Sequence, residues 1–255
     1  MERKDEVSES KYKESDDQLS FRNELASLDH DLSFFPERCF DFNGFSIVME
    51  QDVGDVGGQV WDAEVVLAHY LDQMYGKSSI ASHQEDSTNA EGADGINKLN
   101  CKVLELGAGT GLAGLVAAYL GATTVITDIE PTVQITQRIA DTVLSEKGKD
   151  YSVEELAWGE NLDSFKEKHG CFDVILASDV VYHEHLYDAL IETFQELSSE
   201  LGVVYVSFEQ RRRDLSPFFE RIQHCFCFEK VNTPLLLQAE QLANVHIFQL
   251  ERKPG

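Results

Sequence analysis

Three glycines and an acid at the end of a strand give one stretch of the chain the pattern of a nucleotide-binding site. The stretch from 102 to 128 reads KVLELGAGTGLAGLVAAYLGATTVITD, and its alternating glycines are Gly107, Gly109 and Gly111. Glycine lets a turn adopt positive φ and lets its backbone approach a ligand closely. The helix expected after the turn directs backbone N–H groups back at it. Asp128 ends the second strand, at the sheet edge where ligands bind in open α/β folds.

The glycine spacing separates two classes of nucleotide ligand. A dinucleotide site has the pattern G-x-G-x-x-G, in which the third glycine eases the packing of helix on strand. Here the pattern is G-x-G-x-G, Leu112 stands in the place of that third glycine, and Glu105 adds a second acid before the turn. Leu112 therefore argues against a dinucleotide oxidoreductase. An ordinary strand–helix turn, with glycines for packing alone, is the alternative to any ligand site.

Aromatic and acidic residues also stand at the ends of the later strands. Trp158, Asp179 with Tyr182, and Glu209 each follow such a strand. Because the carboxyl ends of parallel strands meet at one edge of a sheet, we expect these side chains to face one cleft. Packing offers an alternative for each: Trp158 as a core aromatic, and Asp179 and Tyr182 as a helix N-cap and a packing tyrosine. Two nearby histidines alone make a poor metal site, so no metal is expected.

The hydrophobic pattern predicts seven strands, with helices between the first five. The expected strands are 102–106, 124–127, 151–157, 172–177, 203–208, 226–231 and 245–251. The expected helices between them include 112–120, 130–145, 184–198 and 215–225. Short strand–helix spacing requires parallel crossovers, whereas the last strand is expected to arrive without a helix and to lie antiparallel. This predicts an α/β, doubly wound, mostly parallel seven-stranded sheet with an antiparallel last strand.

An N-terminal hairpin and helix precede the sheet. Apolar residues alternate on both sides of Asn43-Gly44 in the segment 38–51, which is a pattern typical of a β-hairpin. Trp61 then stands before an amphipathic helix that runs to about Met74.

Two segments are expected to be disordered. Residues 1–30 and 77–97 are polar and poor in large apolar groups, so they cannot bury enough surface to offset the entropy of ordering. Residues 31–255 are expected to form one domain, with 77–97 as an insertion in it.

Composition limits the partners and the compartment. The chain has 46 acids against 21 bases, a formal net charge of −25, which argues against nonspecific nucleic-acid binding and permits a basic protein partner. Its five cysteines include no C-x-x-C, so we expect reduced, mostly buried thiols in the cytoplasm or the nucleus. The first residues are too charged for a signal peptide, and no apolar run reaches the roughly 20 residues that span a bilayer.

Several motifs together resemble a known family. The segment 105–111, ELGAGTG, closely resembles motif I of the class I S-adenosylmethionine-dependent methyltransferases. With W-D-A at 61–63, A-W-G-E at 157–160, D-V-V-Y at 179–182 and F-E-Q-R at 208–211, the chain is similar to the family 16 protein-lysine methyltransferases. Within them it is most similar to the methyltransferase-like 21 group, which includes the valosin-containing protein lysine methyltransferase. The resemblance covers roughly Arg38 to Glu251.

The resemblance implies a Rossmann-like methyltransferase sheet, an S-adenosyl-L-methionine cofactor and a set of site residues. The residues expected at the cofactor are Trp61, Glu105, Gly107, Ala108, Gly109, Gly111, Asp128, Trp158 and Ser178. Asp128 is expected to accept the ribose hydroxyls, and Trp158 offers a flat apolar face near the adenine. Glu105 is expected either at the backbone of the turn or at the cofactor's ammonium group.

The reactive side of the cleft is expected at Asp179, Tyr182 and Glu209. A lysine has a pKa of roughly 10.4, so restoring its neutral amine at pH 7 costs on the order of 4.6 kcal/mol. A carboxylate beside the amine opposes this deprotonation, so Asp179 is expected to orient the arriving cation rather than act as a general base. Tyr182 is expected to pack against the lysine. The run Arg211-Arg212-Arg213 is expected as a solvated loop, with a clamp on an acidic partner as the alternative.

The implied reaction is methylation of a lysine on a partner protein by a monomeric enzyme. By resemblance, the partner is a chaperone, an ATPase or a translation factor, and neither nucleic acid nor membrane is expected. Alternatives are methylation of a histidine, an N-terminal amine or a small molecule, and a cofactor-binding interaction module of low activity.

Overall fold

The computed structural model describes residues 36–52, 54, 56–76, 99–144, 148–211 and 214–254. The two segments predicted to be disordered, 1–30 and 77–97, lie outside the described residues, as do Arg212 and Arg213.

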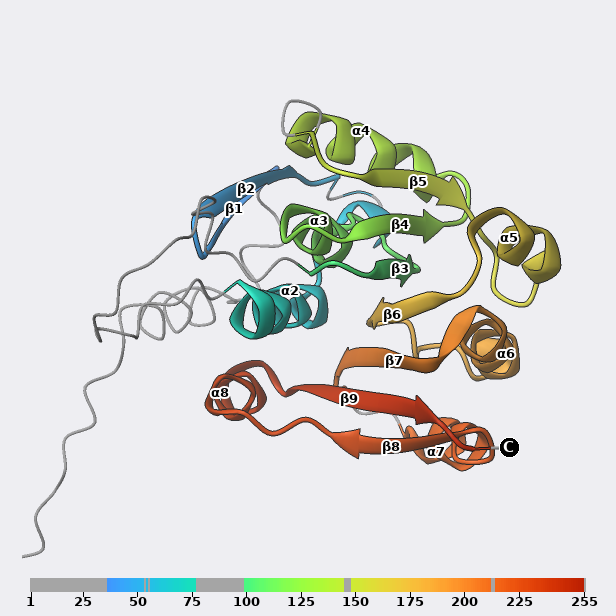
Figure 1. Ribbon diagram of the computed structural model, residues 1–255. Coiled ribbons are helices and arrows are strands. Elements are labelled where there is room, and N and C mark those ends of the chain that lie inside the picture. Colours follow the sequence, from blue (N-terminus) through green and yellow to red (C-terminus); the bar gives the residue numbers. More distant parts are fainter. Residues whose placement is uncertain are drawn as a thin grey trace, which may run out of the picture.

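A seven-stranded sheet forms the centre of the molecule (Figure 1). Its strands are β3 (Lys102–Leu106), β4 (Thr123–Asp128), β5 (Tyr151–Glu155), β6 (Phe172–Ser178), β7 (Ser198–Glu209), β8 (Phe226–Lys230) and β9 (Val245–Arg252). They lie in the order β5-β4-β3-β6-β7-β9-β8, and β3 to β7 pair in parallel. β9 is antiparallel to both β7 and β8. The predicted doubly wound sheet with an antiparallel last strand is confirmed.

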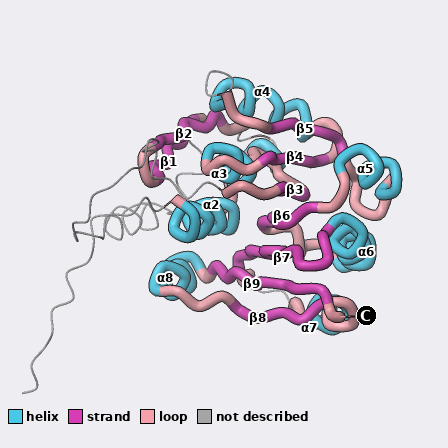
Figure 2. The backbone as a smooth tube through the Cα atoms, in the orientation of Figure 1, coloured by secondary structure: helices cyan, strands magenta, loops and turns pink. Residues whose placement is uncertain are grey.

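Helices cover both faces of the sheet (Figure 2). Four helices share one core with the hairpin: α2 (Asp62–Tyr75), α3 (Leu112–Tyr119), α4 (Thr132–Leu144) and α8 (Pro234–Ala243). The second core lies under α5 (Leu162–His169), α6 (Tyr187–Leu197) and α7 (Ser216–Ile222). The central strands are buried on both sides, which explains why they are almost continuously apolar.

The last connection of the sheet differs from the prediction, because helix α8 lies between β8 and β9. Its start is well specified: Thr233 is the N-cap, its hydroxyl accepts the backbone N–H of Leu236 at 3.2 Å, and Pro234 opens the first turn. Proline suits this position because the backbone N–H that it lacks would have no partner within the helix. The helix buries Leu236 and Ala239, so this segment is a packed element rather than the expected loop.

The predicted hairpin is confirmed, and it packs on the N-terminal side of the domain. β1 (Glu37–Phe42) pairs antiparallel with β2 (Phe45–Glu50) around Asn43-Gly44, and Gly44 has φ +87°. Buried and exposed residues alternate along both strands, with Arg38 buried beside the apolar side chains, and the Phe45 ring stacks on Tyr119 of α3 with ring centres 3.6 Å apart. A short 3-10 helix, η2 (Val56–Gly58), then leads into α2.

The segment predicted as one helix over 184–198 is divided. It forms the 3-10 helix η3 (Glu184–Leu186) and α6, and β7 already begins at Ser198. This longer strand adds pairing between Ser198 and Phe172 at the amino end of the sheet.

The cysteines are free thiols, but the expectation that most are buried is wrong. Cys39 and Cys227 are exposed, and Cys101, Cys171 and Cys225 are partly exposed. Cys39 stands on the outward side of β1, where alternation places it in solvent, and Cys227 lies on the edge strand β8, where three consecutive residues are exposed. In the described part of the chain, no helix is long and apolar enough to cross a membrane.

Candidate active site at the carboxyl edge of the sheet

The glycine turn between β3 and α3 adopts a backbone that other residues would strain. Gly107, Gly109 and Gly111 all have positive φ, at 62°, 55° and 82°. A Cβ atom at Gly107 would lie 2.9 Å from both the Trp158 indole and the Val180 side chain. The turn therefore needs glycine for its conformation and for the close approach of these two neighbours.

Asp128, the last residue of β4, anchors the turn. Its Oδ2 accepts the backbone N–H of Gly109 at 2.8 Å, and its Oδ1 accepts that of Ile129 at 2.7 Å. From α4, the Thr136 hydroxyl donates to the Gly109 carbonyl oxygen at 2.6 Å. A carboxylate has about four acceptor positions, so Asp128 can hold these two N–H groups and also accept hydroxyl groups of a ligand.

Trp158 is held against the turn by the residue that follows it. Gly159 has φ +76°, and its N–H donates to the Thr193 hydroxyl of α6 at 2.9 Å. A Cβ atom at Gly159 would lie 3.0 Å from the Ala189 side chain, so glycine allows the loop to approach α6. Trp158 is half-buried, which leaves part of its ring accessible beside Gly107.

Ser178 ends β6 and pairs in register with Ser207 of β7. It is half-buried at the carboxyl edge of the sheet, on the strand that leads to Asp179. The Ser207 hydroxyl donates to the Ala63 carbonyl oxygen at 2.9 Å, which ties the sheet edge to the start of α2.

Glu105 lies beneath the turn and is closed off from solvent. Its side chain is fully buried, and Oε2 accepts the backbone N–H of Gly114 in α3 at 2.9 Å. Oε1 has no hydrogen-bond partner among the described residues. Burial, and then the neighbouring Glu64, raise the pKa of the Glu105 carboxyl well above its ordinary value, which favours its protonated form.

Glu64 is a second buried carboxyl beside the turn, and the sequence motifs did not point to it. Its Oε1 accepts the backbone N–H of Leu112 at 2.5 Å, and its Oε2 accepts the Thr110 hydroxyl at 2.9 Å. An acid of α2 thus caps the amino end of α3. Burial raises the pKa of Glu64 to about 7, although the bonds from Leu112 and Thr110 act in the opposite direction.

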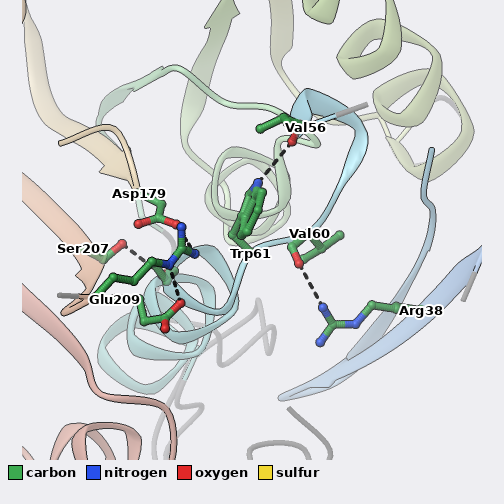
Figure 3. Close-up of polar contacts among 9 residues, drawn as sticks. Arg38, Val56, Val60, Trp61, Asp179, Ser207 and Glu209 are labelled. Carbon is green, nitrogen blue, oxygen red and sulfur yellow. Dashed lines mark hydrogen bonds and ion pairs between the residues drawn. The ribbon is translucent and has the colours of Figure 1, made fainter. Parts of the chain in front are cut away.

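One arginine, Arg211, joins two acids at the carboxyl edge of the sheet, and we call the group Asp179, Tyr182, Glu209 and Arg211 the entrance. The Nη2 of Arg211 lies 2.9 Å from Asp179 Oδ2, and its Nε lies 2.9 Å from Glu209 Oε2. The guanidinium carbon lies 4.8 Å from the ring centre of Trp61, whose Nε1 donates to the Val56 carbonyl oxygen at 3.1 Å. Figure 3 shows Trp61, Asp179 and Glu209 facing one another around this point. Arg211 therefore makes specific contacts at the entrance while its side chain remains 39% exposed.

The loop from Asp179 to Tyr182 forms the outer part of the entrance. Asp179 has φ +52°, an uncommon conformation for an aspartate, and its N–H donates to the Ser207 carbonyl oxygen at 2.7 Å. Tyr182 is 45% exposed, and its ring lies 4.5 Å from that of His183. Partial burial, followed by the charges of Asp128 and Asp179, raises the pKa of the Tyr182 phenol.

The structure thus brings most of the predicted site residues to one edge of the sheet. The cofactor set surrounds the glycine turn, with Glu105 below it, and the set Asp179, Tyr182 and Glu209 stands at the entrance. The two sets are contiguous, because Val180, next to Asp179, lies against Gly107. Among the described residues, no three histidine, cysteine or acidic side chains gather into a possible metal site.

A groove of about 760 Å³ lies elsewhere, between α4 and β5. Acids dominate its charged lining, with Glu130, Asp141, Glu154 and Glu155 against Arg138. It contains none of the predicted site residues. The hydrogen-bonded turn and entrance locate the chemistry better than the size of this groove.

Comparison with known proteins gives one consistent result. A family model described as lysine methyltransferase matches residues 43–225. The chain is 36% identical over 178 residues to protein N-lysine methyltransferase METTL21A of Danio rerio, covering 69% of this chain and 72% of the relative. It is 32% identical over 221 residues to METTL21A of Mus musculus, covering 86% and 88%. A SAM-dependent methyltransferase from Agrobacterium tumefaciens shares the fold, with a TM-score of 0.53 at 13% identity, covering 86% of this chain and 71% of that one.

Proposed function

This chain belongs to the lysine methyltransferase family, and we propose that it methylates a lysine of a partner protein at the entrance formed by Asp179, Tyr182 and Glu209. As a member of this family, it is an S-adenosylmethionine-dependent protein-lysine methyltransferase. The observation that carries the residue assignment is the contiguity of this entrance with the glycine turn, through Val180 and Gly107.

Residues around the turn fit the cofactor. When bound, S-adenosylmethionine supplies a methyl group on a positively charged sulfur, ready for transfer to a nucleophile. Asp128 would accept the ribose hydroxyls, since its carboxylate already lies at the turn and retains its charge-assisted acceptor character. Trp158 would cover the adenine with its accessible ring face. The positive φ values and close contacts of Gly107 support a turn built for backbone approach to a ligand.

Asp179 and Tyr182 would receive the lysine. A carboxylate at an open entrance attracts an ammonium group, and an exposed tyrosine ring can pack against the aliphatic stem or the cationic head. Asp179 orients the amine rather than removing its proton. Its carboxylate is already engaged by the guanidinium of Arg211, 2.9 Å away.

We propose a partner of the chaperone, ATPase or translation-factor type, met by a monomer in the cytoplasm or the nucleus. The net charge of −25 supports a partner with a basic surface around its lysine. Free, partly exposed thiols support a reducing compartment. Light scattering during size-exclusion chromatography checks the monomer, and the mass of a dimer would contradict it.

Radiolabelled methyl transfer into a cell lysate tests the reaction. The wild-type protein is expected to label a distinct protein band, and mass spectrometry is expected to place the methyl group on a lysine. The Asp128→Ala variant should label nothing, because it lacks the ribose acceptor. A label on histidine or on an N-terminal amine would replace the lysine assignment. Binding of S-adenosylhomocysteine without any label would favour the interaction module.

A further inference from the structure

Arg211 makes three specific side-chain contacts, two with acids and one with an aromatic ring. Its guanidinium contacts Asp179 and Glu209, both at 2.9 Å, and lies over the Trp61 ring. Burial lowers its pKa, but Asp179 and Glu209 outweigh this and raise it, so the guanidinium remains charged. Its position is set by three elements that meet at the entrance: the start of α2, the end of β6 and the end of β7.

The charges of this entrance create a difficulty for a lysine methyltransferase. A lysine reacts as the neutral amine, and each nearby carboxylate stabilises the unreactive ammonium form. Two carboxylates, Asp179 and Glu209, face the place where the amine must arrive. Without a compensating cation, they would attract the substrate strongly and hold it in the wrong protonation state.

We propose that Arg211 is a charge-balancing, positioning residue that stays on Asp179 and Glu209 while the lysine is bound, so that these acids orient the amine without holding its proton. This inference rests on the proposed function. Together, Asp179, Glu209 and Arg211 carry a formal charge of −1, whereas the two acids alone carry −2. One excess negative charge suffices to attract an ammonium group, and the smaller excess favours it less once it has arrived.

Other charged and titratable groups of the described residues also lie near Arg211 and Tyr182. From α2, Asp62 is close enough to act on the guanidinium, and from β4, Asp128 acts on the Tyr182 phenol. Both are acids and add to the negative field. His183 lies beside Tyr182 on the outer loop. In the described part of the chain, Arg211 is the cation that contacts both Asp179 and Glu209.

Arg221 offers a matched control. It also contacts two acids, with Nη2 2.8 Å from Glu184 and Nη1 3.3 Å from Asp188, and it lies over the ring of Tyr187. These contacts join η3, α6 and α7, and none of them involves a site residue. Arg221→Gln therefore removes a comparable ion-pair network without changing the charge of the entrance.

A binding experiment tests the charge of the entrance at the position of the cofactor's methyl group, and it needs no protein substrate. Sinefungin carries an amine-bearing carbon in place of the methylated sulfur, whereas S-adenosylhomocysteine carries no charge there. In Arg211→Gln, calorimetry at pH 7 is expected to show sinefungin gaining about tenfold in affinity relative to S-adenosylhomocysteine. Arg211→Lys and Arg221→Gln should keep the wild-type ratio. Because the ratio cancels a general loss of binding, an unchanged ratio in Arg211→Gln would overturn the proposal.

The pH profile of kcat tests whether Arg211 stays in place, with the protein labelled in the lysate as substrate. The profile reports ionisation in the substrate complex. Arg211→Gln is expected to move its apparent pKa up by about one unit, Glu209→Gln to move it down, and the double variant to restore it. If lysine instead displaced Arg211, Arg211→Gln would lower KM and leave the profile unchanged, which would overturn the proposal. Absence of any lysine label would contradict the proposed function, while the binding experiment would still decide the role of Arg211.

Discussion

The Glu64 carboxylate and the Leu112 backbone N–H join two helices at the site, with Oε1 of Glu64 2.5 Å from the Leu112 nitrogen. Glu64 belongs to α2 in the N-terminal extension, and Leu112 begins α3 after the glycine turn. A helix that precedes the nucleotide-binding motif by some forty residues therefore supplies the cap that its turn lacks. The extension thus holds the amino end of α3 at the glycine turn, and its loss should weaken cofactor binding.

The raised pKa of Glu64 predicts how stability changes with pH. Because the pKa of Glu64 is about 7 in the folded chain against 4.5 for an ordinary glutamate, the folded state binds more protons between these values, and stability falls as pH rises through this window. Glu64→Gln keeps an acceptor but does not ionise, so it should flatten this fall, which is at most about 3 kcal/mol. Glu105, whose pKa is also raised, should still contribute part of the fall in stability in the Glu64→Gln variant.

Urea unfolding at pH 5, 6, 7 and 8 measures this effect. The exposed Glu229→Gln, far from the turn on β8, serves as the control and should follow the wild type. An identical pH slope in Glu64→Gln and the wild type would show that Glu64 does not ionise in this range.

Gly107→Ala should disrupt the cofactor site by two routes. Its φ of +62° strains a residue with a Cβ atom, and that atom would lie 2.9 Å from Trp158 and Val180. We expect a stability loss of about 1–3 kcal/mol and at least a tenfold loss of S-adenosylhomocysteine affinity. Gly148→Ala separates the routes, because Gly148 has φ +57° and nothing within 4 Å of a Cβ atom. Equal effects of both substitutions on calorimetric affinity would exclude a steric role for Gly107.

Asp128→Asn should weaken cofactor binding without unfolding the domain. Both Asp128 oxygens accept backbone N–H groups, whereas the asparagine NH2 group would face one of them donor to donor. Loss of a charged acceptor is worth roughly 1.5–3 kcal/mol, so affinity for S-adenosylhomocysteine should fall at least tenfold. Asp141→Asn, which alters a surface acid of α4, should bind normally. Unchanged affinity of Asp128→Asn would remove Asp128 from the cofactor site.

Asp179→Asn should separate substrate handling from cofactor binding. The substitution removes the charge that attracts the ammonium group, so kcat/KM on the labelled protein should fall by about 10- to 100-fold, a loss of roughly 1.4–2.7 kcal/mol. Affinity for S-adenosylhomocysteine should stay within about twofold, because Asp179 is not part of the turn. Wild-type methylation with unchanged cofactor affinity would refute the orienting role.

The local pattern of the chain predicts most of the fold. Alternation around Asn43-Gly44 indicates the hairpin, and apolar strands followed by glycine indicate the parallel sheet, because both are short-range consequences of backbone geometry. Helix α8 could also have been predicted, because Thr233-Pro234 is a helix start signal. The signal was missed because the segment lies between two strands that were expected to be joined by a loop.

The sequence predicts less of the site than of the fold, because the contacts that build the site join residues far apart in the chain. Glu64 stands in the first turn of α2, where an acid is ordinary, and nothing local indicates that it caps another helix. Arg211 follows β7 in a basic run typical of a solvated loop. Its contact with Asp179 depends on β6 and β7 being neighbours, and its contact with Trp61 depends on where α2 crosses the sheet.

The bond between Ser207 and Ala63 spans 144 positions of the chain, and the Arg211 contact with Trp61 spans a similar distance. Contacts so far apart in sequence form late and slowly in folding. During synthesis, the glycine turn and Asp128 would emerge long before Arg211, so a partly made chain holds the motif without its entrance. Strand β9, which pairs with β7 beside Glu209, is made later still, so the entrance gains its last neighbouring strand only near the end of synthesis.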